Sequence, residues 1–125
     1  MEIIGVGIDI VEVGRIKSAI AEKNNFLKRI FSEKEIKLSE RGKFRFEELA
    51  GRFAVKEAVF KALKTGWRRG VAFKDIVVLN EPSGAPYVEL HGKAQEYASL
   101  TGVKNVFVSI SHTKGLAVAI VLLMK

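Results

Sequence analysis

The sequence predicts a single α+β domain over residues 1–125, in which a small antiparallel sheet packs with a long central helix. A chain of 125 residues fits one hydrophobic core, because two domains of half that size would each be marginal. The composition is that of a globular protein, with 48% hydrophobic and 28% charged residues. Strand-like patterns lie near both ends of the chain, at residues 3–10 and 105–123, and the longest helical pattern lies between them.

The first predicted element is a strand over residues 3–10, where apolar residues are interrupted by Gly5, Gly7 and Asp9. Glycines inside a strand mark places at which another backbone approaches closely. Asp9 is expected near the exit of this strand.

Helices are predicted next. Residues 13–30 carry apolar residues at roughly helical spacing and basic residues on the other faces, which indicates a basic helix followed by a second short one. Ser32 and Glu35 match the capping-box pattern, in which a hydroxyl and a carboxylate reciprocally satisfy free backbone amides. A further helix is therefore expected to start there and to end near residues 41–42.

The longest helix is predicted over residues 46–65, closing at Gly66, a residue suited to the left-handed conformation after a helix. On a helical wheel, small and branched apolar residues form one arc that is expected to face the core. These residues are Ala54, Val55, Ala58, Val59 and Ala62. Two charged stripes, with Phe53 and Phe60 between them, complete the helix. The stripes contain Glu57, Lys61 and Lys64 on one side and Arg52 and Lys56 on the other.

The rest of the chain predicts strands, a turn and one more helix. Strands are expected over residues 73–79 and 86–90, with a turn at 81–84 between them, and a helix over 92–100. A terminal hairpin is expected from residues 105–111 and 116–123, which flank Thr113, Lys114 and Gly115.

The charge of the chain indicates an anionic partner. A formal net charge of +7 suits nucleic acid, an acidic protein, a phosphorylated small molecule or a membrane surface. The lack of cysteine excludes disulfides and thiolate metal sites, and it favours a cytoplasmic location. The longest apolar run, residues 116–124, is too short to span a membrane, and the N-terminus lacks a signal-peptide pattern.

Asp9 and Glu57 are candidate ligands of Mg²⁺, an ion that is commonly held by one or two carboxylates together with substrate phosphates. Lys61 beside them would neutralise phosphate charge, and this mixture suits phosphoryl transfer. The alternative is a solvated helix face on which Glu57 and Lys61 form an ordinary surface pair. The phenylalanines between the charged stripes and the second carboxylate favour a site, although convergence of Asp9 and Glu57 is an assumption at this point.

Four segments, in order along the chain, resemble one family, the holo-acyl-carrier-protein synthase group of 4′-phosphopantetheinyl transferases. They are GVGIDI at residues 5–10 with RI at 15–16, GRFAVKEA at 51–58 with KA at 61–62 and TG at 65–66, GAP at 84–86, and VSISHT at 108–113. The resemblance implies transfer of the 4′-phosphopantetheine arm of coenzyme A to a serine of apo acyl carrier protein, with release of adenosine 3′,5′-bisphosphate. It also implies Mg²⁺ dependence, a part in fatty acid biosynthesis, an α+β fold, and a homotrimer with active sites between subunits.

The resemblance also assigns residues. It implies that Asp9 and Glu57 bind the metal and that Lys61 meets the coenzyme phosphates, so that these three form the catalytic group, with Glu57 as the candidate base for the serine proton. Further residues match segments that line the coenzyme pocket of this family. They are Arg52, Phe53, Lys56, Gly84, Pro86, Ser111, His112 and Thr113. His112 taken alone is more simply a structural histidine, and Gly84 and Pro86 are also common turn residues.

Lys64 departs from the family pattern, which commonly has glycine before the Thr-Gly pair. On the helical wheel Lys64 extends the stripe of Glu57 and Lys61. It is therefore expected either to bind coenzyme phosphate or to face solvent.

Basic residues near the N-terminus are expected to dock the acidic carrier protein, and they are Arg15, Lys23, Lys28 and Arg29. The alternative for these residues is an ordinary solvated face.

Two other functions stay open. A nucleic-acid-binding module fits the charge but does not explain Asp9 and Glu57, and no nucleic-acid-binding motif is present. A noncatalytic binder of an acidic partner does not explain the intact set of Asp9, Glu57 and Lys61. No nucleic-acid or membrane partner is therefore expected.

Overall fold

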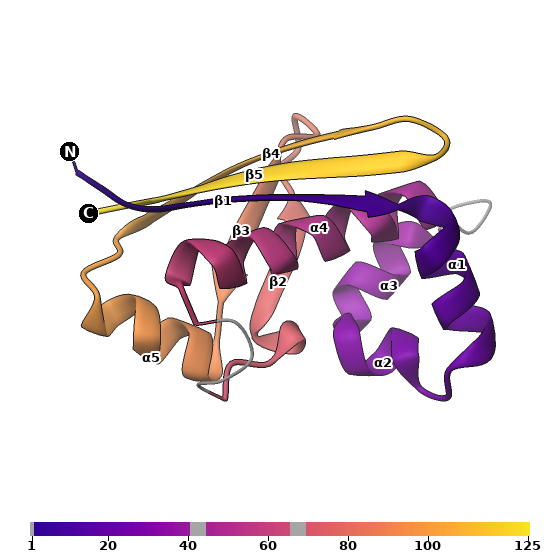
Figure 1. Ribbon diagram of the computed structural model, residues 1–125, viewed down its shortest axis with the longest axis horizontal. Helices are drawn as coiled ribbons and strands as arrows, with labels where there is room; N and C mark the ends of the chain where they lie inside the picture. The colour runs from indigo at the N-terminus through magenta and orange to yellow at the C-terminus, as the bar shows by residue number, and fades with distance from the viewer. Residues whose placement is uncertain (1, 41–44, 66–69) are drawn as a thin grey trace.

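The computed structural model describes residues 2–40, 45–65 and 70–125 (Figure 1). A three-stranded antiparallel sheet, in the order β1-β5-β4, lies along the long helix α4, and β2 and β3 form a second antiparallel pair. The strands are β1 (Ile3–Glu12), β2 (Ile76–Asn80), β3 (Pro86–Leu90), β4 (Asn105–His112) and β5 (Leu116–Met124). The helices are α1 (Val13–Glu22), α2 (Phe26–Ile30), α3 (Glu33–Ser39), α4 (Phe46–Leu63) and α5 (Gly92–Leu100). The predicted α+β arrangement of an antiparallel sheet on a long helix is confirmed.

Strand β1 lies directly on α4 because two of its residues have no side chain. A Cβ atom added to Gly5 would lie 2.1 Å from the carbonyl oxygen of Ala62, and one added to Gly7 would lie 1.8 Å from that of Ala58. The predicted close backbone approach is thus confirmed, with small residues on both sides. Asp9 follows Gly7 by two residues, so its side chain points to the same face of the strand.

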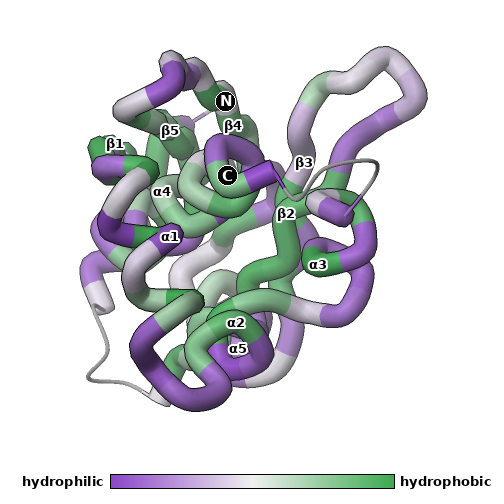
Figure 2. Tube along the Cα trace, turned by 90° about the vertical axis from the view of Figure 1, so that its right-hand side faces the viewer, coloured by the Kyte–Doolittle hydropathy of each residue, from purple (hydrophilic) through white to green (hydrophobic). Residues whose placement is uncertain are grey.

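The opposite face of the sheet is apolar and exposed. On β1 the side chains of Val6, Ile8 and Ile10 point away from α4, and they are 53%, 58% and 63% exposed. The strand register continues this face, because Ile8 lies beside Ile120 of β5. Phe107 of β4 adds a further exposed side chain, and the tube in Figure 2 is predominantly hydrophobic along β1, β4 and β5. Apolar faces of this extent are typical of surfaces that another chain covers.

Helix α3 begins as predicted. The Ser32 hydroxyl accepts a hydrogen bond from Glu35 N at 3.3 Å, and Glu35 Oε1 accepts one from Ser32 N at 2.9 Å. The helix ends at Ser39, and the expected end near residues 41–42 lies outside the described part of the chain.

A buried ion pair joins α3, α4 and β2. Lys56 Nζ lies 3.0 Å from Glu35 Oε1, and both side chains are 0% exposed. The same ammonium donates to the carbonyl oxygens of Phe73 and Ile76, and Glu35 Oε2 accepts from Val78 N. Burial lowers the pKa of Lys56, and the Glu35 carboxylate opposes this shift. The charged stripe of Arg52 and Lys56 on the helical wheel is therefore part of the interior.

Two predicted boundaries differ from the structure. Helix α4 ends at Leu63, and Lys64 adopts the left-handed conformation, with φ of 62°, that was expected for Gly66. Gly66 itself lies outside the described residues. Phe73–Asp75 forms a short 3-10 turn instead of the start of a strand, and β2 begins directly after it.

Candidate active site

Charged side chains gather where β1 crosses α4. Lys61 Nζ donates to Asp9 Oδ1 at 3.0 Å and to the carbonyl oxygen of Ile8 at 2.9 Å. Lys61 thus forms its ion pair with Asp9 rather than the surface pair with Glu57 that was the alternative. Partial burial raises the pKa of Glu57, and the charge of Asp9 adds to this shift, whereas Lys61 and Arg15 oppose it. Asp9 therefore lies close enough to Glu57 to disfavour the charged form of Glu57, a repulsion that a bound cation would relieve. We call Asp9, Glu57 and Lys61 the acidic cluster.

The acidic cluster fits a magnesium ion that takes further oxygens from a substrate. Within residues 2–40, 45–65 and 70–125, no group of three or more histidine, aspartate or glutamate side chains is placed to hold a metal. Two carboxylates are nonetheless sufficient protein ligands for Mg²⁺ when phosphates complete its coordination. The Lys61 side chain is 55% exposed, so a phosphate can reach its ammonium from solvent.

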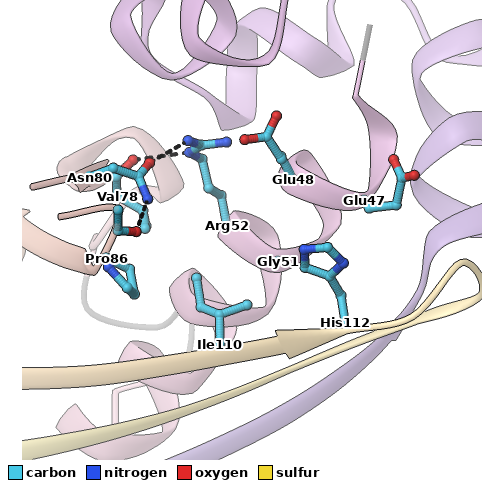
Figure 3. Close-up of a pocket in the computed structure, with 10 residues that line it drawn as sticks. Glu47, Glu48, Gly51, Arg52, Val78, Asn80, Pro86, Ile110 and His112 are labelled. Carbon is cyan, nitrogen blue, oxygen red and sulfur yellow. Dashed lines mark hydrogen bonds between the residues drawn. The ribbon is translucent and has the colours of Figure 1, made fainter. Parts of the chain in front are cut away.

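A cleft of about 250 Å³ lies on another side of α4 (Figure 3). Its lining comes from the N-terminal half of α4, from the β2–β3 hairpin and from β4. The lining residues are Glu47, Glu48, Gly51, Arg52, Val78, Asn80, Gly84, Pro86, Ile110 and His112. Four residues that were predicted for the coenzyme pocket, namely Arg52, Gly84, Pro86 and His112, are therefore brought together.

The acidic cluster and the cleft do not meet within one chain. The register places Asp9 beside Ala119 and Ala119 beside Ile110, so the whole width of β5 separates β1 from β4. Two strand spacings amount to about 10 Å between the backbones of Asp9 and Ile110. On α4, Arg52 and Lys61 are nine residues apart, which directs them to opposite sides of the helix at about 100° per residue. The predicted site residues thus form two groups.

Phe53 and Lys56 are predicted coenzyme contacts that do not line this cleft. The ring of Phe53 stacks on Phe73 with centroids 5.5 Å apart and lies 6.4 Å from the ring of Phe26. The three N–H donors of Lys56 are taken by Glu35 and two backbone carbonyls. Lys56 therefore has no donor left for a coenzyme, and its position assigns it to the interior.

The predicted residues near the terminal hairpin also separate. The Thr113 hydroxyl accepts hydrogen bonds from Gly115 N at 3.3 Å and Leu116 N at 3.2 Å, so it shapes the turn. Ser111 pairs with Val118 and points to the face of the sheet away from α4, whereas His112 lines the cleft. Coenzyme contact by Ser111 and Thr113 stays a prediction.

Lys64 is exposed at the end of α4 with positive φ. Glycine adopts this backbone conformation without the steric cost that a side chain brings. The positive φ thus suits the glycine that the resemblance implies at this position, and the exposed side chain agrees with the solvent-facing alternative.

Six lining residues of the cleft were not among the predicted site residues, and three of them, Glu47, Glu48 and Asn80, have polar side chains. Glu47 and Glu48 lie in the first turn of α4, where acidic residues suit the helix dipole for structural reasons alone. Asn80 ends β2, and its signal was its place between a buried apolar run and the turn before Gly84. A polar residue at the end of a strand is a common way to direct a side chain into a cleft.

The basic residues proposed for carrier docking are exposed, and they are Arg15, Lys23, Lys28 and Arg29. Helix α1 follows β1 directly, so this surface begins next to the acidic cluster (Figure 1). Arg15 is close enough to Glu57 to oppose the rise of its pKa. A partner bound to these helices would therefore reach the acidic cluster.

Comparison with known proteins identifies the class of enzyme. The family model of the 4′-phosphopantetheinyl transferase superfamily matches residues 5–121. The holo-[acyl-carrier-protein] synthase of Clostridium tetani is 49% identical over 117 residues, which are 94% of this chain and 92% of that protein. This chain belongs to the 4′-phosphopantetheinyl transferase superfamily, which confirms the resemblance and the transferase class.

Solved structures give the same result. The holo-[acyl-carrier-protein] synthase of Neisseria meningitidis superposes with a TM-score of 0.88 at 30% identity, covering 99% of this chain and 100% of that one. The Helicobacter pylori holo-[acyl-carrier-protein] synthase in complex with coenzyme A superposes with a TM-score of 0.81 at 36% identity, covering 95% of this chain and 99% of that one. The predicted 4′-phosphopantetheinyl transferase-like fold is confirmed. In the described segments, no helix is both long and apolar enough to cross a membrane.

Proposed function

We propose that this chain transfers the 4′-phosphopantetheine group of coenzyme A to a serine of apo acyl carrier protein and thereby supports fatty acid biosynthesis. Family membership and the coenzyme A complex of a relative support the reaction and its donor. The observation that carries the proposal is the contact of Lys61 with Asp9 beside the half-buried Glu57. Phosphoryl transfer depends on such a combination of metal-binding carboxylates and a cation near the transferring phosphate.

The residues of the acidic cluster have distinct roles in this reaction. The serine oxygen forms a bond to the phosphorus that carries pantetheine, and the bond from that phosphorus to adenosine 3′,5′-bisphosphate breaks. Asp9 and Glu57 would hold Mg²⁺, which supplies positive charge to the pyrophosphate. The ammonium of Lys61 offsets negative charge on the phosphate oxygens. Glu57 is also the candidate base for the proton of the serine hydroxyl, because its carboxylate lies at the same site.

We further infer that two subunits of a homotrimer form each site. The cleft of one chain, with Arg52, Gly84, Pro86 and His112, would hold the nucleotide end of coenzyme A. The acidic cluster of a neighbour would then act on its pyrophosphate. The separation of the two groups within one chain and the exposed apolar face of the sheet both support this arrangement. Light scattering in dilute solution tests the trimer, and a stable monomer with full activity would contradict it.

The carrier protein is proposed to dock on the basic surface of α1 and α2. An acidic partner is attracted there mainly during encounter, and salt screens this attraction. The affinity for the carrier is expected to fall with ionic strength and after reversal of charge at Arg15 and Lys28. The lack of cysteine and the use of coenzyme A suit a cytoplasmic enzyme.

The transfer itself is tested by mass spectrometry of apo acyl carrier protein after incubation with this protein, coenzyme A and Mg²⁺. The expected result is a mass gain of one phosphopantetheine group, lost when the metal is chelated or when Glu57→Gln replaces the wild type. Lys93→Ala is a matched control, because Lys93 is an exposed charge on α5 with an ordinary surface pair to Glu96. No mass gain over a range of metals and salt concentrations would contradict the proposal.

A further inference from the structure

The side chain of Asn80 joins the wall of the cleft to its rim. Arg52 Nη2 donates to Asn80 Oδ1 at 2.8 Å, and Asn80 Nδ2 donates to the carbonyl oxygen of Gly84 at 3.0 Å (Figure 3). The orientation of the amide follows from its partners, because a guanidinium only donates and a carbonyl only accepts. Each end of the amide therefore has one suitable partner.

Arg52 is held by residues of two elements, the end of α3 and strand β2. Its side chain is 3% exposed. Besides the bond to Asn80, Nε donates to the carbonyl oxygen of Val78 at 3.1 Å, and Nη1 donates to the Ser39 hydroxyl at 3.2 Å. Ser39 and Val78 belong to the core, with exposures of 0% and 1%, whereas Asn80 is exposed at the cleft. Asn80 is thus the partner of Arg52 that can be replaced without disturbing the interior.

The rim of the cleft depends on the same side chain. Gly84 has φ of 94°, and its N–H donates to the carbonyl oxygen of Glu81 at 2.8 Å within the turn of the hairpin. Asn80 pairs with Pro86 as the last rung of the β2–β3 ladder before this turn. The bond from Asn80 to Gly84 therefore links the turn to the guanidinium that faces the cleft.

We propose that Asn80 is a positioning residue that orients Arg52 toward a phosphate of coenzyme A and holds the hairpin rim in the geometry that receives it. This inference rests on the proposed function, in which Arg52 contacts the coenzyme. A neutral amide suits the task, because it accepts from the guanidinium without neutralising its charge. An aspartate would pair with Arg52 and would repel both the Gly84 carbonyl and an incoming phosphate.

The comparison of Asn80→Ala with Asn80→Asp tests this role. The alanine variant loses both hydrogen bonds, whereas the aspartate variant keeps the contact with Arg52. We expect the melting temperature to fall further for Asn80→Ala than for Asn80→Asp. The KM for coenzyme A is expected to change in the reverse order, with a rise of roughly fivefold for alanine and about tenfold or more for aspartate. The kcat of both variants should stay near that of the wild type.

A second measurement keeps binding separate from catalysis. Calorimetric titration with adenosine 3′,5′-bisphosphate measures affinity directly. The affinity is expected to be highest for the wild type, lower for Asn80→Ala and lowest for Asn80→Asp, the same order as the KM values give. Gln95→Glu is the matched control, because it makes the same change of amide to carboxylate on α5, where Gln95 bonds only to Ser99 among the described side chains. Its KM and its affinity for the bisphosphate are expected to equal those of the wild type.

Each outcome decides the inference. If Asn80→Ala had both the lower melting temperature and the higher KM of the two variants, Asn80 would only hold the hairpin, and the positioning role would be rejected. If the wild type transfers the group and both Asn80 variants have the same KM as the wild type, the positioning role would also be rejected, and the proposed function would stay intact. A wild type that neither transfers the group nor binds the bisphosphate would overturn both.

Discussion

The two charged sides of α4 are built in different ways. Toward α3 and β2, Lys56 is fully buried, and its ammonium contacts Glu35 and two backbone carbonyls. Toward β1, Lys61 is 55% exposed and shares its ammonium with Asp9 and one carbonyl. The same residue type, five positions apart, is thus part of the interior in one case and accessible to a ligand in the other. Whether a neighbouring element covers the stripe decides which role a charge on this helix takes.

The largest expected effect is on the buried side. Lys56→Met leaves the Glu35 carboxylate buried without its partner, which is expected to lower the free energy of unfolding by about 3–5 kcal/mol in a urea titration. The double variant Glu35→Leu with Lys56→Met removes the unpaired charge and is expected to be more stable than the single variant. If Lys56→Met lowered the free energy of unfolding by less than about 1 kcal/mol, the buried lysine would contribute no more than an exposed one, and the two sides of α4 would not differ as described.

On the accessible side, replacing Lys61 by methionine is expected to lower the rate of the reaction and to leave the stability nearly unchanged. Lys61→Met removes an exposed ion pair, so the free energy of unfolding should change by no more than about 1 kcal/mol. The rate of phosphopantetheine transfer is expected to fall roughly 100-fold, because a cation near the transferring phosphate is lost. Parallel urea titrations and transfer assays of the two methionine variants make the comparison direct. Equal transfer rates for Lys61→Met and wild type would remove Lys61 from the proposed site.

The end of α4 gives a smaller effect. Lys64→Gly relieves the left-handed conformation of a residue with a side chain and is expected to raise the free energy of unfolding by about 1 kcal/mol. If Lys64 only faces solvent, the KM for coenzyme A should stay unchanged. A raised KM would instead support the predicted phosphate contact.

The smallest effect concerns the pH dependence of stability. The folded protein raises the pKa of Glu57, mainly by partial burial and also through Asp9, so ionisation of this carboxyl works against the folded state. At pH values well below the ordinary carboxyl range, Glu57 is neutral in both states, and Glu57→Gln should match the wild type in stability. As pH rises through and above that range, Glu57→Gln should become the more stable protein in metal-free buffer. A difference that shrinks with rising pH would show that folding does not raise the pKa of Glu57.

Much of the fold could be predicted because local patterns determined it. The capping box of Ser32 and Glu35, the alternation of β1 around Gly5 and Gly7, and the terminal hairpin are each encoded within a few residues. The burial of Arg52 and Lys56 could not be predicted in this way. A helical wheel gives angles around α4, but the acceptors that cover these cations come from α3 and β2, which are distant in sequence.

The sequence predicted many residues of the candidate site, but it did not predict which of them lie together. Asp9 and Lys61 do meet, and four predicted pocket residues do share a cleft. Their separation into two groups depends on the strand order β1-β5-β4, which places the width of β5 between them. Strand order is a property of the whole sheet and has no signal in any one segment. Asn80 was missed for a related reason, since its partners Arg52 and Gly84 come from separate elements.

The contact of Gly5 and Gly7 with α4 has a consequence for the way this enzyme can diversify. Bare backbone meets backbone there, so the interface contains no rotamers that could absorb an error by repacking. The spacing between the backbones that carry Asp9 and Lys61 is therefore fixed at these two contacts by the backbone alone. Variation in the coenzyme or carrier that is accepted must come from the cleft and the basic helices, where side chains can change while the reacting centre keeps its dimensions.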